Sequence, residues 1–322
     1  MKHLLATAAA LGLLAGSAHA EKWDMPMAYA ASNFHSENGA EFAKCVTDKT
    51  GGELEITTHP GGSLFKGGEI KRAVQTGQVK IGERLLSAHA NEEPIFGIDS
   101  VPFLATSFDD SVKLYDVAKP EIEKALDEQN LKLLYSVPWP PQGLYFKKPV
   151  ASVEDMKGLK FRAYNASTSR LAELAGMQPT QIEAAEVQQA FSTNAVESMI
   201  SSGATGYDRK VFDAGVTHYY EVDAWLPRNT VFVNKDAYDA LPDAQKTALT
   251  ECAAEAEERG LQKSKDYTQF TYDGLREGGM TVEPASDSLK GELQEIGKTM
   301  TDEFLADAGD SGKAVVEQFR GQ

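Results

Sequence analysis

One short segment, DMKGLKFRAYN at residues 155–165, indicates both the architecture and the kind of site that this chain carries. Residues 160–162 are expected to form a short strand that leaves a loop, and Arg162 lies on that strand. A second segment, FSTNAVES at residues 191–198, follows in the same half of the chain. A guanidinium is planar, always charged and presents a fork of donors that matches a carboxylate. The segment therefore predicts a two-point grip on a small organic acid.

The N-terminus predicts export. A short basic start is followed by twelve apolar residues, 4–15, and by a small-residue cleavage site at residues 18–20. This is the layout of a signal peptide that is removed after Ala20. The alternative, an uncleaved membrane anchor, is disfavoured because the apolar run is short for a membrane span.

The balance of charge excludes some partners. Removing residues 1–20 takes away only Lys2 among the charged residues, so the formal net charge changes from −16 to −17. A chain this acidic is a poor candidate for binding nucleic acid or an anionic membrane. The remaining 302 residues (322 − 20) are enough for a large core, and two domains are expected.

The two cysteines, Cys45 and Cys252, fall on the apolar faces of two expected helices. Export to an oxidising compartment permits a disulfide. The cysteines either pair or remain two separate buried thiols, and the sequence leaves both alternatives open.

Strands and helices are expected to alternate along the chain. The expected strands cover residues 22–31, 54–58, 79–82, 131–137, 144–147, 160–162, 177–180, 196–200 and 231–233. The expected helices cover residues 35–49, 67–76, 108–117, 120–129, 167–175 and 186–192, then a long one from Pro242 to about Arg276, one over 289–304 and a short one at the end.

Two features divide this α/β chain into lobes. The segment PWPPQG at residues 138–143 is too rich in proline for regular structure, so it is expected to be a hinge. The long helix after Pro242 is too long for one small lobe and is expected to span both. The predicted first lobe comprises residues 21–139 and 227–266, and the second comprises residues 140–226 and 267–322.

Signatures of catalysis are missing from this sequence. It has no GxSxG, no HExxH, no phosphate loop and no dinucleotide fingerprint. The histidines after residue 20 have no metal-ligand spacing with one another or with a cysteine. The sequence therefore predicts a binding protein without metal or cofactor, although a periplasmic enzyme acting on a carboxylate remains an alternative.

Several segments, taken in order, resemble one family. They are DMKGLKFR at 155–162, GMQPT at 176–180 and EVQQAFSTNAVE at 186–197, preceded by HPGGSL at 59–64, AVQTGQV at 73–79 and VPFL at 101–104, and followed by VN at 233–234 and LP at 241–242. Together they resemble the DctP-type solute-binding proteins of TRAP (tripartite ATP-independent periplasmic) transporters. The resemblance covers nearly the whole chain after residue 20.

The resemblance implies an α/β, two-lobed periplasmic-binding-protein-like fold that closes over a carboxylate ligand without chemical change. It implies a monomeric periplasmic receptor that delivers an organic acid to the small and large membrane subunits of a TRAP permease, with no cofactor. A receptor that signals to a membrane sensor is the alternative. By resemblance, Arg162 pairs with the ligand carboxylate.

Other candidate ligand contacts rest on position in the expected cleft. They are Gln142, Trp139, Tyr164, Asn165, Ser201, Asn33 and His35. Gln142 replaces a second basic residue of some relatives, which suggests a ligand with one carboxylate, or one with a hydroxyl or keto group at that end. Asn165 and His35 are equally expected as helix caps, and Trp139 as hinge packing. Glu83 and Arg84 either reach the cleft or pair at the surface.

Overall fold

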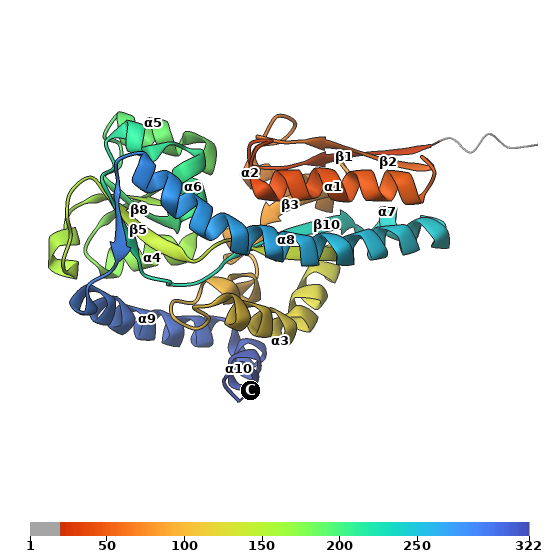
Figure 1. The fold of residues 1–322 in the computed structure, drawn as a ribbon. Coiled ribbons are helices and arrows are strands. Elements are labelled where there is room, and N and C mark those ends of the chain that lie inside the picture. Colours follow the sequence, from red (N-terminus) through yellow and green to blue (C-terminus); the bar gives the residue numbers. More distant parts are fainter. Residues whose placement is uncertain (1–19, 322) are drawn as a thin grey trace, which may run out of the picture.

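The computed structural model describes residues 20–321, and the expected signal peptide, residues 1–20, lies outside this range apart from Ala20. Helices and strands gather into two lobes, and helix α8 (Asp243–Glu277) runs along both (Figure 1). Among the described residues, no helix is both long enough and apolar enough to cross a membrane.

The first lobe contains two small sheets. Its strands are β1 (Glu21–Pro26), β2 (Leu54–His59), β3 (Ile81–Leu85), β4 (Leu131–Pro138) and β10 (Arg228–Asn234). Strands β1 and β2 are parallel, and β10 lies between β3 and β4, antiparallel to both. A bridge between Met27 and Glu83 connects the two sheets.

Helices cover both faces of β10. The helices of this lobe are α1 (Phe34–Lys49), α2 (Gly67–Gln75), α3 (Phe108–Asp127) and α7 (Lys235–Asp239), with 3-10 turns η1 (Leu86–His89) and η2 (Pro94–Ser100). Val231 and Val233 pack in a core with α1 and α8. Phe232 points to the opposite face and packs in a second core with α2 and α3. The two-residue alternation of a strand thus makes β10 the centre of the lobe.

The second lobe is built on one mixed sheet with the order β11-β9-β5-β8-β6-β7. Its strands are β5 (Gln142–Phe146), β6 (Lys160–Ala163), β7 (Gln178–Gln181), β8 (Ser198–Ser202), β9 (His218–Glu221) and β11 (Thr281–Pro284). Its helices are α4 (Ala166–Leu174), α5 (Val187–Ser192), α6 (Gly203–Asp208) and α9 (Asp287–Asp307), with 3-10 turns η3 (Val153–Met156), η4 (Ala184–Glu186) and η5 (Val211–Ala214).

Two extended segments connect the lobes side by side. The chain leaves the first lobe between β4 and β5 and returns between β9 and β10. The Trp139 backbone N–H donates to the Pro227 carbonyl at 2.7 Å, and the Gln142 N–H donates to the Trp225 carbonyl at 3.0 Å. The proline-rich hinge predicted from the sequence is therefore one of two hydrogen-bonded crossings.

Helix α8 forms a third connection, as the sequence predicts. It packs on α1 and β4 of the first lobe and on α6 and β11 of the second. A disulfide joins Cys45 of α1 to Cys252 of α8, with a Cα–Cα distance of 5.9 Å. The structure thereby decides between the two alternatives that the sequence left open.

The prediction of two helices, over 108–117 and 120–129, is wrong. Helix α3 continues through Pro120. Leu114, Ala118 and Ile122 lie on one buried face of it, and this shared packing outweighs the cost of an internal proline. The strand expected over 22–31 is too long, because β1 ends at Pro26, and strands β9 and β11 were missed.

The lobe boundaries remain a prediction, but the last helix lies where that prediction does not put it. Helix α10 (Gly309–Arg320) contacts α3. Its Val315 and Val316 share a core with Ile122 and Leu126 of α3. Residues 309–320 therefore pack on the first lobe, although residues 267–322 were assigned to the second.

Candidate functional site

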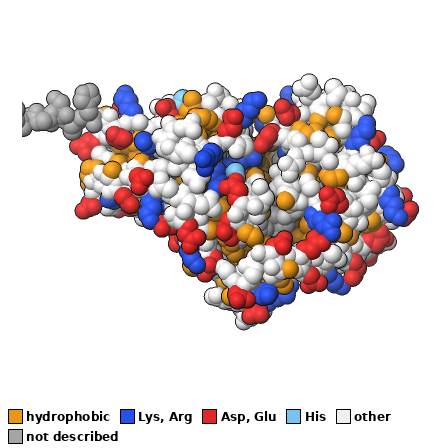
Figure 2. Space-filling model, turned by 180° about the vertical axis from the view of Figure 1, so that it is seen from behind, with side chains coloured by type: hydrophobic (Ala, Val, Ile, Leu, Met, Phe, Trp, Pro, Cys, Tyr) orange, Lys and Arg blue, Asp and Glu red, His pale blue; other side chains and the backbone are white. Residues whose placement is uncertain are grey.

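A pocket lies between the lobes. Seen from the face opposite to that of Figure 1, the surface is hollowed between them and basic side chains gather there (Figure 2). The pocket is lined by Tyr29, Arg84, Leu85, Trp139, Gln142, Arg162, Tyr164, Glu183, Ala184, Ser201, Ser202, Thr205 and Pro227.

Arg162 is the central charge of this pocket. On β6 its neighbours Phe161 and Ala163 point into the core of the second lobe, so the strand alternation directs Arg162 to the other face. Its Nε donates to the Ile182 carbonyl at 2.8 Å. Within residues 20–321 its two terminal nitrogens have no hydrogen-bond or ion-pair partner. Burial lowers the pKa of Arg162 to about 10, because removal from water disfavours the charged form.

Tyr164 packs against the Arg162 guanidinium, and Gln142 bonds to Tyr164. The Arg162 guanidinium lies 5.2 Å from the centre of the Tyr164 ring. Trp225 Nε1 donates to the Tyr164 hydroxyl at 2.9 Å, and that hydroxyl donates to Gln142 Oε1 at 3.1 Å. Gln142 Nε2 donates to the Pro140 carbonyl at 3.0 Å. This chain of hydrogen bonds fixes the positions of both predicted residues in the pocket wall.

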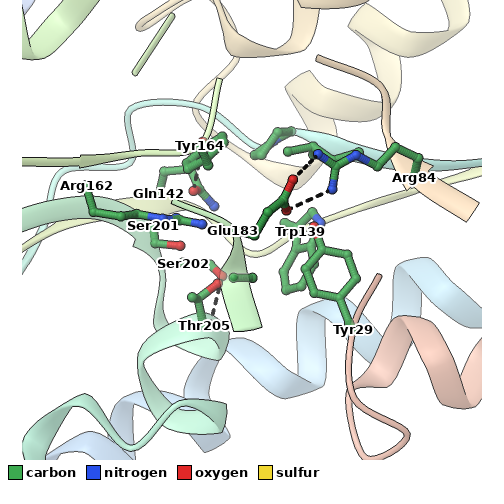
Figure 3. A pocket seen from close by; sticks show the side chains of 13 residues that line it. Tyr29, Arg84, Trp139, Gln142, Arg162, Tyr164, Glu183, Ser201, Ser202 and Thr205 are labelled. Carbon is green, nitrogen blue, oxygen red and sulfur yellow. Dashed lines mark hydrogen bonds and ion pairs between the residues drawn. The ribbon is translucent and has the colours of Figure 1, made fainter. Parts of the chain in front are cut away.

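Apart from Arg84 and Glu183, uncharged side chains form the rest of the walls. Arg162 reaches in from one side, and Trp139 and Tyr29 lie on the opposite side (Figure 3). The Trp139 and Tyr29 rings meet edge to face, with centroids 4.8 Å apart. Ser201, at the end of β8, lines the pocket and has no hydrogen-bond partner in the described part of the chain. The walls thus offer an aromatic surface and free hydroxyl groups.

An ion pair between the lobes lies beside the pocket. Arg84 of β3 makes two hydrogen bonds to Glu183 of the second lobe, of 3.2 and 3.0 Å (Figure 3). Arg84 is buried, whereas the Glu183 side chain is 47 % exposed. The pair joins the lobes at the edge of the pocket, so this structure is a closed form.

Three predicted site residues lie outside the pocket lining. Asn33 caps α1, and its Nδ2 donates to Asp208 Oδ2 of the second lobe at 2.8 Å. Asn165 caps α4 and donates to Ser87 Oγ at 3.1 Å. His35 is buried behind Trp139, with ring centroids 4.3 Å apart. Hydrogen bonds or packing occupy all three side chains in this structure, and their contact with a ligand stays a prediction.

Sequence reasoning missed several lining residues, notably Tyr29, Glu183 and Thr205. Tyr29 was placed inside a strand that ends earlier, at Pro26, and Glu183 follows a short edge strand. Strand alternation does distinguish Glu83 from Arg84, since Arg84 lines the pocket and Glu83 is buried on the other face.

The pocket carries one net positive charge. Arg84 and Glu183 neutralise each other, and Arg162 remains. Within residues 20–321, no cluster of three or more histidine, cysteine or acidic side chains is arranged to hold a metal ion. The arrangement can bind one small carboxylate.

The fold and pocket define a two-lobed periplasmic binding protein. Residues 27–307 match the family model described as DctP, bacterial extracellular solute-binding protein, family 7, and the chain belongs to this family. It is an extracytoplasmic solute receptor of the TRAP type, and receptors of this type bind small carboxylates and work with membrane permease subunits. The predicted family, fold and receptor function are confirmed.

Solved structures provide close relatives. A marine metagenome TRAP solute-binding protein, described as specific for pyroglutamate and solved with co-purified pyroglutamate, is 52% identical; the match covers 94% of this chain and 99% of that one, with a TM-score of 0.93. DctP6 of Bordetella pertussis, described as binding pyroglutamic acid, is 46% identical over 94% of this chain and 100% of that one, with a TM-score of 0.92.

A more distant relative was found by sequence comparison. It is a monocarboxylate 2-oxoacid-binding periplasmic protein of Nostoc, 26% identical over 88% of this chain and 79% of its own length.

Proposed function

We propose that this receptor binds pyroglutamate, a flat five-membered lactam with one carboxylate. The observation that carries the proposal is the buried Arg162 guanidinium, whose two terminal nitrogens have no partner among residues 20–321 and face a pocket of one net positive charge. A monoanion neutralises this pocket, whereas a dicarboxylate brings a second charge that finds no unpaired cation among the described residues that line it.

The chemistry of the walls supports a cyclic, polar ligand. Trp139 and Tyr29 offer aromatic surface for a flat ring, and Ser201 offers a hydroxyl that can donate to a lactam carbonyl. The two relatives described as pyroglutamate binders are also far more similar to this chain than the monocarboxylate 2-oxoacid binder.

Binding is a closure step. The acid enters between open lobes, and its carboxylate accepts two hydrogen bonds from Arg162. The lobes then close by hinge motion, and the Arg84–Glu183 pair forms at the pocket edge. Closure removes water from the ion pair and strengthens it. The closed monomer acts in the periplasm after signal-peptide cleavage, hands the acid unchanged to the small and large permease subunits, and has no enzymatic activity.

Titration calorimetry tests the ligand. The protein is first unfolded and refolded to remove co-purified ligand, and is then titrated with L-pyroglutamate. We expect binding. In unfolding experiments, a ligand concentration of 100 times Kd should raise the free energy of unfolding by about 2.7 kcal/mol. Two controls are compared with it: 2-pyrrolidinone keeps the lactam ring but lacks the carboxylate, whereas L-glutamate lacks the ring and also carries an ammonium group and a second carboxylate.

Both controls are expected to bind far more weakly than pyroglutamate. Absence of pyroglutamate binding, together with tight binding of a dicarboxylate, would overturn the proposed ligand. Equal binding of 2-pyrrolidinone would refute the role of Arg162 as the carboxylate partner.

A further inference from the structure

The wall of the pocket formed by Trp139 rests on a buried polar cluster. Trp139 belongs to the first crossing between the lobes, and only 4% of its surface is exposed. The Phe34 and His35 rings of α1 pack against it, with centroids 5.3 and 4.3 Å away. Behind these rings lie polar side chains that take no part in the proposed ligand contacts.

Hydrogen bonds connect this cluster to the indole. Trp139 Nε1 donates to Asn229 Oδ1 at 2.8 Å, and Asn229 Nδ2 donates to Glu83 Oε1 at 3.3 Å. His35 Nδ1 lies 3.6 Å from the same Glu83 oxygen. Because an amide has one acceptor and one donor side, the Glu83 acceptor determines which side of Asn229 faces the indole.

The cluster is costly for folding. His35 Nδ1 and Nε2, Glu83 Oε2 and the Tyr135 hydroxyl are all buried without a hydrogen-bond partner in the described structure. Burial raises the pKa of Glu83 to about 7 and lowers that of His35 well below its ordinary value. Apolar residues at such positions commonly give equal or greater stability. Stability alone therefore does not account for these residues.

We infer that Glu83 and Asn229, with His35 packed beside them, are positioning residues that fix the Trp139 indole as a rigid wall and thereby favour a flat cyclic acid over its open-chain analogue. The preference for a ring rests on the proposed function. The fixed position of the Trp139 indole does not depend on the proposed function. The wall is in place before closure, because His35, Glu83, Trp139 and Asn229 all belong to the first lobe or to the crossing that leaves it.

A double-mutant cycle on the full mature protein tests the selectivity. The ligands are L-pyroglutamate and N-acetyl-L-alanine, which is the same molecule with one ring bond opened. Asn229→Leu is expected to weaken pyroglutamate binding about tenfold and N-acetyl-L-alanine binding less than twofold. In a Trp139→Phe background, which already lacks the indole N–H, Asn229→Leu should have no further effect.

Glu83 variants separate position from stability. Glu83→Gln keeps an oxygen that accepts from Asn229, so it should retain the wild-type affinity, whereas Glu83→Leu should behave like Asn229→Leu. Thermal unfolding of each variant checks that the lobe is folded. Equal loss of affinity for both ligands, or additive effects in the cycle, would overturn the inference.

A second measurement needs no ligand. The chain has three tryptophans, so ¹⁵N-indole labelling gives few signals, and Trp139→Phe assigns one of them. We expect the Trp139 indole N–H to exchange slowly in the wild type and in Glu83→Gln, and quickly in Glu83→Leu. Unchanged protection in Glu83→Leu would refute the fixed indole. Failure of pyroglutamate to bind, with protection behaving as expected, would refute only the proposed ligand and the ring preference.

Discussion

Arg162→Met removes the guanidinium and keeps a side chain of similar length. Two effects of opposite sign are expected from the structure. The ligand carboxylate loses both charge-assisted hydrogen bonds, so affinity falls. The ligand-free protein loses a buried cation that has no counter-ion within residues 20–321, so its stability should stay constant or rise.

The magnitude follows from the two free terminal nitrogens of Arg162. Truncating one partner of a buried, hydrogen-bonded charge pair costs about 2–5 kcal/mol, which corresponds to a roughly 30- to 4,000-fold weaker Kd. The single bond from Nε to the Ile182 carbonyl, at 2.8 Å, is the only described hydrogen bond lost from the ligand-free protein, and such a bond contributes about 1 kcal/mol.

Calorimetry with L-pyroglutamate and thermal unfolding of ligand-free protein measure the two effects. Arg170→Met is the matched control, because Arg170 is a partly exposed arginine paired with Glu303 at 2.7 Å, away from the pocket lining. The control should bind as the wild type does. Unchanged affinity in Arg162→Met, or a loss of affinity that merely follows a large loss of ligand-free stability, would refute the reasoning.

Three further predictions concern stability and closure. Replacing Cys45 and Cys252 by serine removes a crosslink between residues 207 apart and should lower the free energy of unfolding by about 2–5 kcal/mol in guanidinium titrations; identical curves for variant and wild type would contradict this. Gly67→Ala puts a Cβ 2.5 Å from the guanidinium of the interlobe ion pair, whereas the added Cβ of Gly68→Ala meets nothing closer than 3.8 Å. Calorimetry should therefore find weaker ligand binding for the first variant only, and equal binding by both would show that closure tolerates the methyl group. Burial raises the pKa of Glu83 from 4.5 to about 7, so the stability that it contributes below pH 4.5 is lost as pH rises through 7. The free energy of unfolding of Glu83→Gln, relative to the wild type, should therefore be higher at pH 8 than at pH 4 by roughly 3 kcal/mol. If this difference between variant and wild type does not change with pH, the raised pKa of Glu83 is wrong.

Local pattern predicted the elements that carry most of the site. Strand β6 places Arg162 by simple alternation, and the apolar stripe of α8 gave its length to within a residue or two. The disulfide was compatible with the sequence but undecided, because pairing depends on how α1 and α8 lie against each other.

The features that the sequence did not specify depend on long-range geometry. Arg84 and Glu183 meet across 99 positions of sequence, and no local signal pairs them. His35 and Asn33 lie at the start of α1, where each residue turns the side-chain direction by about 100°. The sequence could place both residues near the cleft, but it could not show which way their side chains point. The Asn33 side chain also accepts a hydrogen bond from the His35 backbone as the cap of α1.

The disulfide has a mechanical consequence for α8. The helix has 35 residues and is therefore about 52 Å long, but Cys252 clamps its first half to α1. Gly260 extends this clamp, because it packs so closely on Val137 that an added Cβ would lie 2.4 Å from it. Contacts with α1 continue past Gly260, because Lys263 Nζ lies 3.0 Å from Glu41 Oε1 and the Tyr267 ring packs on Phe34. Tyr267 also donates to Asp208 of the second lobe at 2.6 Å, so we expect α8 to bend near Tyr267 when the lobes open.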